Sequence, residues 1–286
     1  MALIDVLAAL RPKQWTKNAF VLVGPLFGHR WAGDGLWQAA LAFIAFCLAS
    51  SAVYVYNDWV DREADRHHPL KRLRPIAAGR LSGAAIAATG LLCGFAACAL
   101  AASIGPAMLF LISAYFGLNV AYTVWLKHVV IADIFAIAGG FQLRLFGGTV
   151  GLGIPPSQWL LLCGFSLTLL LALGKRRGEL VTPGHTGTTR SVLGAYSLDL
   201  IDQLLAICAT LTLAAYGLYT ISPDTVAVHG AGDLPYTIPI VTYGVFRYLV
   251  ILRGDNDGDP SKLLFTDRQL QVTAVLWLAA VVWMMR

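Results

Sequence analysis

Nine apolar runs follow one another along this chain, and short segments rich in polar residues, Gly or Pro separate them. A membrane-spanning helix needs about 20 mostly apolar residues. No run alternates with a period of two, as the strands of a membrane barrel would. The pattern therefore predicts an all-α integral membrane protein with nine transmembrane helices in one bundle. The runs are Trp15–Phe27, Leu36–Tyr56, Ala84–Ile104, Met108–Trp125, Val129–Val150, Trp159–Leu173, Val192–Ile221, Tyr236–Leu252 and Leu270–Met285.

Composition agrees with this class. Of the 286 residues, 57% are hydrophobic and only 13% are charged, whereas a soluble domain carries about 25% charged residues. This excludes a disordered chain, a nucleic-acid-binding domain and an ordinary cytosolic enzyme. No low-complexity linker divides the sequence, so we expect residues 1–286 to form a single transmembrane domain.

Basic residues are distributed unequally between the two sides that nine crossings define. Because Lys and Arg favour cytoplasmic loops, the bias predicts a plasma-membrane protein with a cytoplasmic N-terminus and an outer C-terminus. The first run is short and contains Pro25, but without its crossing three cations would fall on the poor side. Eighteen of the 21 basic residues share the predicted cytoplasmic side: Arg11, Lys13, Lys17, Arg62, Arg66, Lys71, Arg72, Arg74, Arg80, Lys127, Lys175, Arg176, Arg177, Arg190, Arg247, Arg253, Lys262 and Arg268; Arg30 and Arg286 lie opposite.

A row of acidic residues follows the second apolar run. Asp58, Asp61 and Asp65 stand at positions i, i+3 and i+7, with Asn57 beside them, so a helix places them on one face. Three like charges on one face repel each other, and a positive partner is expected there. Carboxylate and amide oxygens suit Mg²⁺, which binds through one or two carboxylates together with substrate phosphates.

The segment after this row is strongly basic. Lys71, Arg72 and Arg74 occur between Pro69 and Pro75, and proline fixes the backbone angle φ and stiffens the loop. Cations held beside a magnesium-binding face are what a pyrophosphate requires. The loop therefore predicts binding of a phosphorylated substrate.

Two charges fall inside the fifth run. Asp133 and Arg144 are costly in a membrane and are candidates for a functional site. Asp199 and Asp202, early in the seventh run, share a helical face and form a weaker candidate. The pairs Gly139-Gly140 and Gly147-Gly148 predict close packing between helices.

The pattern NDxxDxxxDRxHPxKRxRPIAAG, which spans residues 57–79, resembles the first signature of the UbiA superfamily of intramembrane prenyltransferases. The resemblance extends along the whole chain in the number and placement of the runs and loops. It implies a nine-helix bundle around a cavity open to the cytoplasmic side. It also implies that Asn57, Asp58, Asp61 and Asp65 are the catalytic residues and that they hold Mg²⁺ and pyrophosphate.

The chain departs from the common members of that superfamily after the sixth run. Where those proteins carry a second acidic motif, this sequence has Lys175, Arg176 and Arg177 followed by Glu179. In this respect, and in residues 11–18, 50–54 and 141–144, the chain resembles the branch of decaprenyl-phosphate phosphoribosyltransferases. The resemblance implies transfer of 5-phosphoribose from phosphoribosyl pyrophosphate to decaprenyl or another polyprenyl phosphate. The products are pyrophosphate and a lipid-linked precursor of arabinose-type cell-wall glycans.

Charge balance supports this reading. The reaction brings together a pyrophosphate, a 5-phosphate and a lipid phosphate, and fixed cations reduce their repulsion. The lipid phosphate is already ionised, so no strong general base is needed. We expect the following residues to bind the substrates: Gln14 and Lys17 at the lipid phosphate, Lys71, Arg72, Arg74, Arg144, Lys175, Arg176 and Arg177 at phosphates, and Glu179 at a ribose hydroxyl or a second Mg²⁺.

Two other functions fit parts of the sequence. A prenyltransferase that moves a polyprenyl group to an aromatic acceptor would share the first acidic motif, but the basic second loop disfavours it. A transporter for phosphorylated sugars would need access from both faces and often shows inverted repeats, which this chain lacks. The expected partners are the two substrates and the membrane, with no nucleic acid; the sequence is compatible with a homo-oligomer and does not define the polyprenyl length.

Overall fold

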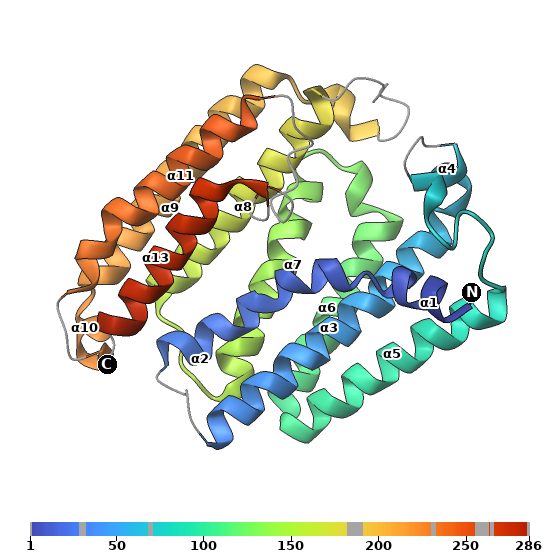
Figure 1. Ribbon diagram of the computed structural model, residues 1–286, viewed down its shortest axis with the longest axis horizontal. Coiled ribbons are helices and arrows are strands. Elements are labelled where there is room, and N and C mark those ends of the chain that lie inside the picture. The colour runs from blue at the N-terminus through green and yellow to red at the C-terminus, as the bar shows by residue number, and fades with distance from the viewer. Residues whose placement is uncertain are drawn as a thin grey trace. The chain divides into compact units, whose positions relative to one another are not determined.

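The computed structural model describes residues 2–28, 33–67, 71–181, 191–229, 233–254, 263 and 266–284 (Figure 1). Helices account for nearly all of these residues, and the described part of the chain contains no strand. The chain divides into two compact units, Met1–Pro155 and Pro156–Arg286, with the boundary along the chain between Pro155 and Pro156. The predicted all-α class is confirmed, while the single-domain organisation stays a prediction.

Unit 1 is built around the long helix α3, Asp34–Val60, which packs against α5, α6 and the 3-10 helix η1. Its core contains small residues such as Ala42, Ala45 and Ala49, all fully buried, beside the large side chains of Phe46 and Met108. Small residues on a helix let neighbouring helices approach closely. The other elements of the unit are α1 Ala2–Leu10, η1 Pro12–Leu22, α2 Val23–Phe27, α4 Arg62–Arg66, η2 Lys71–Leu73, α5 Gly83–Ile104, α6 Pro106–Val124, η3 Leu126–His128, α7 Ala132–Gly148 and η4 Val150–Leu152.

The predicted close packing at Gly147-Gly148 is confirmed. A Cβ atom at Gly148 would overlap the carbonyl oxygen of Val21 in η1, and one at Gly147 would overlap the ring of Phe46. Backbone therefore meets backbone between α7 and the N-terminal segment. This contact fixes the height at which η1 lies along α7.

Unit 2 contains α8 Gln158–Val181, η5 Ser191–Ala195, α9 Leu198–Ile221, α10 Pro223–His229, η6 Leu234–Thr237, α11 Ile238–Leu252 and α13 Arg268–Met284. Helix α9 begins later than the apolar run predicted because Ser197 caps it, accepting a hydrogen bond from the backbone of Leu200 at 3.1 Å. An N-cap serine satisfies a backbone donor that the helix itself leaves free.

Asp267 caps α13 in the same manner. Its Oδ1 accepts from the backbone N–H of Leu270 at 2.9 Å, and its Oδ2 accepts from Arg247 of α11 at 2.7 Å. The hydrogen bond from Arg247, followed by that from the Leu270 backbone, holds the pKa of Asp267 below its ordinary value. This carboxylate thereby connects α11 to the start of α13.

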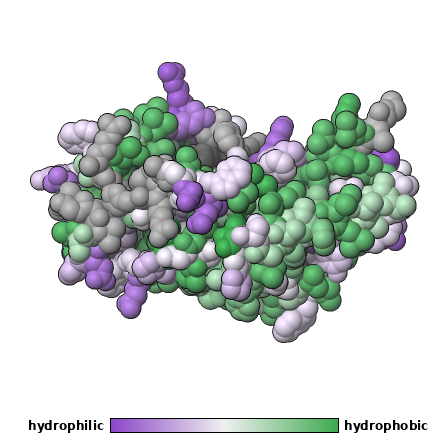
Figure 2. Space-filling view, turned by 90° about the horizontal axis from the view of Figure 1, so that it is seen from below, coloured by the Kyte–Doolittle hydropathy of each residue, from purple (hydrophilic) through white to green (hydrophobic). Residues whose placement is uncertain are grey.

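Seven helices in the described residues are long and apolar enough to cross a membrane. They correspond to the second through eighth predicted runs. The last run forms the shorter helix α13 of 17 residues, and the first forms η1 and α2. Figure 2 shows hydrophobic residues over much of one face, and Leu91, Leu92 and Phe95 of α5 are among the large apolar side chains exposed to the surroundings. Arg30 and Arg286, the two cations predicted on the outer side, lie outside the described residues.

Candidate active site

The acidic row lies at the junction of α3 and α4. Asn57 and Asp58 belong to the last turn of α3, Asp61 stands between the helices, and Asp65 belongs to α4. The backbone N–H of Asp61 donates to Asn57 at 2.9 Å, and that of Asp65 donates to Asp61 at 2.8 Å. The helical hydrogen-bond spacing is thus kept across the junction, which leaves Asp58 and Asp65 on one face, 3% and 4% exposed.

Positive side chains neutralise this face, as the clustering of like charges predicts. A single nitrogen of Arg74, Nη1, donates to Asp58 at 3.0 Å and to Asp65 at 2.6 Å. Arg11 forms a second ion pair with Asp58. Removing one partner of a buried ion pair leaves an uncompensated charge and costs about 3–5 kcal/mol, so these arginines stabilise the fold of the junction.

Asp61 and Asn57 contact a different segment, which consists of the end of α6 and the turn after it. Lys127 donates to Asp61 at 2.7 Å, and the Asp61 side chain keeps 40% of its surface exposed. The hydroxyl of Thr123 donates to the side-chain oxygen of Asn57. The four residues of the motif therefore contact groups from three other segments of unit 1.

The N-terminal segment docks on α3 through the residues that resemble the phosphoribosyltransferase branch. The indole N–H of Trp15 donates to Ser51 at 3.0 Å, and the Ser51 hydroxyl donates to the carbonyl of Leu10 at 2.9 Å. Arg11 lies 5.1 Å from the ring centre of Tyr54 and has a left-handed backbone, with φ at 52°, which is uncommon for a residue other than glycine. Together these contacts aim the Arg11 guanidinium at Asp58.

Arg144 is buried in a network of neutral groups. Its three nitrogens donate to the side chain of Asn18 at 2.7 Å, the carbonyl of Gly140 at 2.8 Å and the hydroxyl of Tyr115 at 2.8 Å. Asn18 in turn donates to Ser50 at 3.2 Å. Arg144 therefore joins α7, α6 and η1, and its hydrogen bonds go to these neutral groups, whereas those of Arg74 go to the acidic motif.

Other predicted substrate-binding residues of unit 1 are placed less centrally. Gln14 and Lys17 lie half-buried on η1, and Lys71 lies half-buried on η2. Arg72 is exposed and, within the described part of the chain, pairs with none of the three aspartates. The structure thus brings Arg74 to the acidic motif but not Arg72.

The basic motif of unit 2 lies in the last turns of α8. Arg176 is fully buried and forms an ion pair with Glu179 one turn later. Arg177 donates to Asp202 of α9 at 2.7 Å and to the carbonyl of Leu252 at the end of α11. Both arginines are therefore fixed by protein acceptors, while Lys175 is half-buried.

Several site residues were not singled out as site residues by sequence reasoning. Arg11 was visible only as part of the motif of residues 11–18, and Lys127 only as a cytoplasmic cation. Asn18 likewise belonged only to that motif, and Thr123 and Tyr115 carried no signal of their own. Their roles depend on partners 29 to 126 positions away in the chain, which no local pattern specifies.

The acidic motif fits a divalent cation by its donor chemistry. Asp58 and Asp65 already share one positively charged nitrogen, so two carboxylate oxygens converge on a position that a cation occupies. No group of three or more His, Cys, Asp or Glu in the described residues converges as a metal site. Mg²⁺ commonly uses only one or two carboxylates and completes its shell with water and substrate phosphates, so two suffice.

The fold and the site together define a multi-span membrane protein with a carboxylate and arginine cluster at the end of a membrane helix. The model of the UbiA prenyltransferase family matches residues 18–268. The chain belongs to this family, and the predicted resemblance is confirmed.

Relatives and solved structures agree. The chain is 35% identical to a decaprenyl-phosphate phosphoribosyltransferase of Corynebacterium glutamicum over 97% of its own length and 85% of that protein. It is 33% identical to the Mycolicibacterium smegmatis protein of the same name, over 96% and 91% of the two chains. A UbiA homologue from Archaeoglobus fulgidus, solved with GPP and Mg²⁺, shares the fold with a TM-score of 0.74 at 15% identity, over 98% of this chain and 99% of that one.

Proposed function

We propose that this chain transfers 5-phosphoribose from phosphoribosyl pyrophosphate to a polyprenyl phosphate and releases pyrophosphate. The observation that carries the proposal is the presence of two motifs in one chain. The first is acidic, with two carboxylates bridged by an arginine, and the second is basic. The names of the relatives from Corynebacterium and Mycolicibacterium give the same activity, and the match covers nearly the whole chain. The product would be a precursor of arabinose-type cell-wall glycans.

The proposed step is a substitution at C1 of the ribose. The bond from C1 to the pyrophosphate oxygen breaks, and a bond from C1 to a lipid phosphate oxygen forms. The leaving group takes both bonding electrons, and no proton must move because the attacking phosphate is ionised at neutral pH. The residues need only bind, orient and neutralise charge, which matches a site built from carboxylates and cations.

Asn57, Asp58, Asp61 and Asp65 are the proposed holders of Mg²⁺, which when bound would neutralise the leaving pyrophosphate. Arg74 and Arg11 already touch these carboxylates, and we propose that they donate to phosphate oxygens when the substrate arrives. Lys71 and Arg72 serve the same donor substrate from the adjacent segment. Arginine suits this role because its fork of N–H groups matches phosphate geometry.

The remaining residues are assigned by their chemistry. Gln14 and Lys17 contact the lipid phosphate, and Arg144 holds the N-terminal segment on which they lie. Lys175, Arg176 and Arg177 supply positive charge for a further phosphate, and Glu179 keeps Arg176 in place or contacts a ribose hydroxyl. These assignments are part of the proposal.

The same proposal includes the topology. Nine crossings, a single domain and a cavity on the cytoplasmic side accommodate the bias of the basic residues toward one face. The N-terminus and the segments around residues 57–80 and 175–190 then face the cytoplasm of a bacterial-type plasma membrane, and the C-terminus faces outward. Cysteine labelling at exposed positions of intact cells tests this arrangement.

A two-substrate assay tests the activity. Purified protein receives labelled phosphoribosyl pyrophosphate, polyprenyl phosphate and Mg²⁺ in one reaction, and polyprenyl pyrophosphate with 4-hydroxybenzoate in another. We expect a labelled lipid product in the first reaction only, and its loss when EDTA is present. Product in the second reaction alone would replace the proposal with aromatic prenyl transfer.

A further inference from the structure

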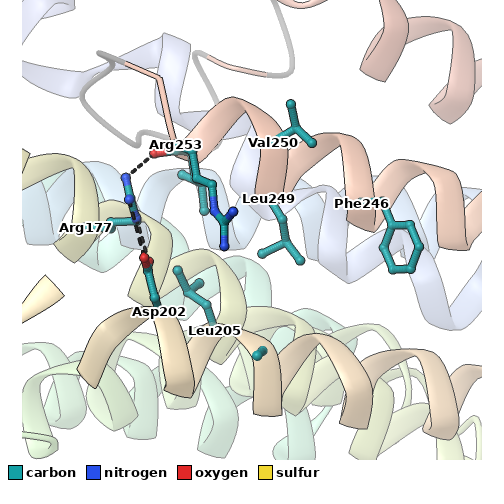
Figure 3. Close-up of a pocket in the computed structure, with 9 residues that line it drawn as sticks. Arg177, Asp202, Leu205, Phe246, Leu249, Val250 and Arg253 are labelled. Carbon is teal, nitrogen blue, oxygen red and sulfur yellow. Dashed lines mark hydrogen bonds and ion pairs between the residues drawn. The ribbon is translucent and has the colours of Figure 1, made fainter. Parts of the chain in front are cut away.

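A pocket of about 320 Å³ lies between α9 and α11 of unit 2 (Figure 3). Its size falls at the lower end of ligand-binding cavities, which span about 300–1,000 Å³. Apolar side chains form most of its wall, and charged side chains gather at one end. The lining residues are Leu205, Ala206, Phe246, Leu249, Val250 and Leu252 on the apolar side and Arg177, Asp202 and Arg253 on the charged side.

The charged end carries one net positive charge. Arg177 is held by Asp202 and by the carbonyl of Leu252, so its guanidinium is fixed. Arg253 is exposed, and no carboxylate in the described residues pairs with it. Figure 3 shows its guanidinium pointing into the pocket between Arg177 and Leu249. An arginine in this state has N–H donors available for an anion.

The charged end coincides with the ends of membrane helices. Arg253 directly follows the candidate span Leu234–Leu252, Arg177 lies in the last turn and a half of α8, and Asp202 lies in the second turn of α9. The apolar wall extends from there along both helices, with Leu205 and Ala206 further into α9 and Leu249 and Phe246 further back in α11. The pocket is thus polar at the membrane boundary and apolar toward the bilayer interior.

We infer that this pocket is a second binding position for the polyprenyl phosphate acceptor, apart from the attacking position proposed at Gln14 and Lys17, and that it holds the phosphate head and the first isoprene units. The inference rests on the proposed function for the identity of the lipid. A phosphate monoester carries a charge of about −1.5 to −2 at neutral pH and three acceptor oxygens, so the net positive end of the pocket attracts it and Arg253 has N–H donors for its oxygens. The small volume accommodates one chain beside the exposed ring of Phe246, whereas a phospholipid brings two.

Binding of labelled polyprenyl phosphate to the purified protein, with no phosphoribosyl pyrophosphate present, tests this inference. Arg253→Gln removes the available cation, and Ala206→Phe fills the apolar wall. We expect Arg253→Gln to weaken binding about tenfold, the loss typical of one charge-assisted hydrogen bond. We expect Ala206→Phe to weaken binding as well, because its ring fills space that the isoprene units need. Arg268→Gln and Ala214→Phe are matched controls, because both residues are exposed in unit 2 and neither lines the pocket, and they should leave binding unchanged.

Turnover separates this inference from the proposed function. In an active protein, both pocket variants should raise the KM for polyprenyl phosphate and leave the KM for phosphoribosyl pyrophosphate unchanged. If both variants bind the lipid as well as the unaltered protein does and turnover persists, the pocket is not a lipid site and the proposed function stands. Equal displacement of the label by phosphatidylglycerol would overturn it in favour of a bilayer lipid. If the protein shows no turnover but both pocket variants still weaken lipid binding, the proposed function is wrong and the pocket is a lipid site.

Discussion

This protein has two ionic clusters, one in each unit. They differ in whether the negative or the positive side chains come from a single short stretch of sequence. In unit 1 the carboxylates come from one short stretch of sequence, and the arginines reach them from other segments. In unit 2 adjacent arginines of α8 are neutralised by Glu179 of the same helix and Asp202 of the next. The side chains of Arg11 and Arg74 are 23% and 31% exposed, against 0% and 11% for Arg176 and Arg177. Exposed partners can exchange for a ligand, whereas buried ones stay fixed.

The largest effect is expected at Asp61, whose carboxylate pairs with a single lysine and is 40% exposed. Asp61→Ala should lower product formation by about 10³-fold, the scale seen when one preorganised electrostatic group is removed. The melting temperature in detergent should change little because the residue is half-exposed. Asp224→Ala, an exposed aspartate on α10 of unit 2, is the control and should retain full activity. Near-normal turnover of Asp61→Ala would remove the acidic motif from the mechanism.

Replacing Arg74 should test directly whether a bound cation can take the place of this arginine. Arg74→Met leaves Asp65 without its ion pair and Asp58 with Arg11 alone, at a cost of about 3 kcal/mol in the free energy of unfolding. Mg²⁺ should then raise the melting temperature of this variant by more than that of the unaltered protein, because the cation position is vacated. Melting curves of both proteins, each recorded with and without Mg²⁺, check this. Equal shifts of the melting temperature in the two proteins would contradict it.

Unit 2 should respond in the opposite way. Arg176→Met removes the ion pair of Arg176 with Glu179, whose side chain is 16% exposed, and should destabilise the unit by about 2–3 kcal/mol, with no rescue by Mg²⁺. The double variant Arg176→Met with Glu179→Gln should recover most of that loss, because both charges of this ion pair are then removed together. A double variant as unstable as the single one would show that Arg176 acts through contacts other than this ion pair.

The smallest effect is expected at Asp267. Since the folded-state pKa of this carboxyl is lowered by Arg247 and the Leu270 backbone, its contribution to stability is present above the unfolded-state value near 4 and is lost as the pH falls through the folded value. Asp267→Asn should therefore lower the melting temperature slightly at pH 7 and have no effect at the acid end of the curve. A difference that persists at low pH would assign the effect to the N-cap alone.

Local patterns predicted the elements better than their partners. The apolar runs located the long helices. The spacing of Asp58, Asp61 and Asp65 predicted one shared face, which holds for Asp58 and Asp65 but is wrong for Asp61, whose carboxylate pairs with Lys127 instead. Arg72 and Arg74 differ in their contacts, because Arg74 pairs with two of the acids and Arg72, among the described residues, pairs with none of the three aspartates. The roles expected for Lys71, Arg72 and Arg74 at phosphates stay predictions. A run of cations identifies a basic segment, but which member turns inward depends on packing against α3 and α4.

The first apolar run shows a second limit. Its composition predicts a helix, but not that residues 12–22 wind as a 3-10 helix. The backbone contact of Val21 with Gly148 of α7 and the docking of Trp15 on Ser51 fix this segment at both ends. Tertiary contacts of this kind override helical propensity, and they lie more than 30 positions away in the sequence.

This winding has a consequence for how far so short a segment reaches. A 3-10 helix rises about 2.0 Å per residue against 1.5 Å in an α-helix, so the 11 residues of η1 extend about 22 Å. The five residues of α2 add about 7 Å. The total approaches the thickness of a bilayer's hydrocarbon core, about 30 Å, which an α-helix would need about 20 residues to cover. The tighter winding thus lets the N-terminal segment span a greater distance than an α-helix with the same number of residues.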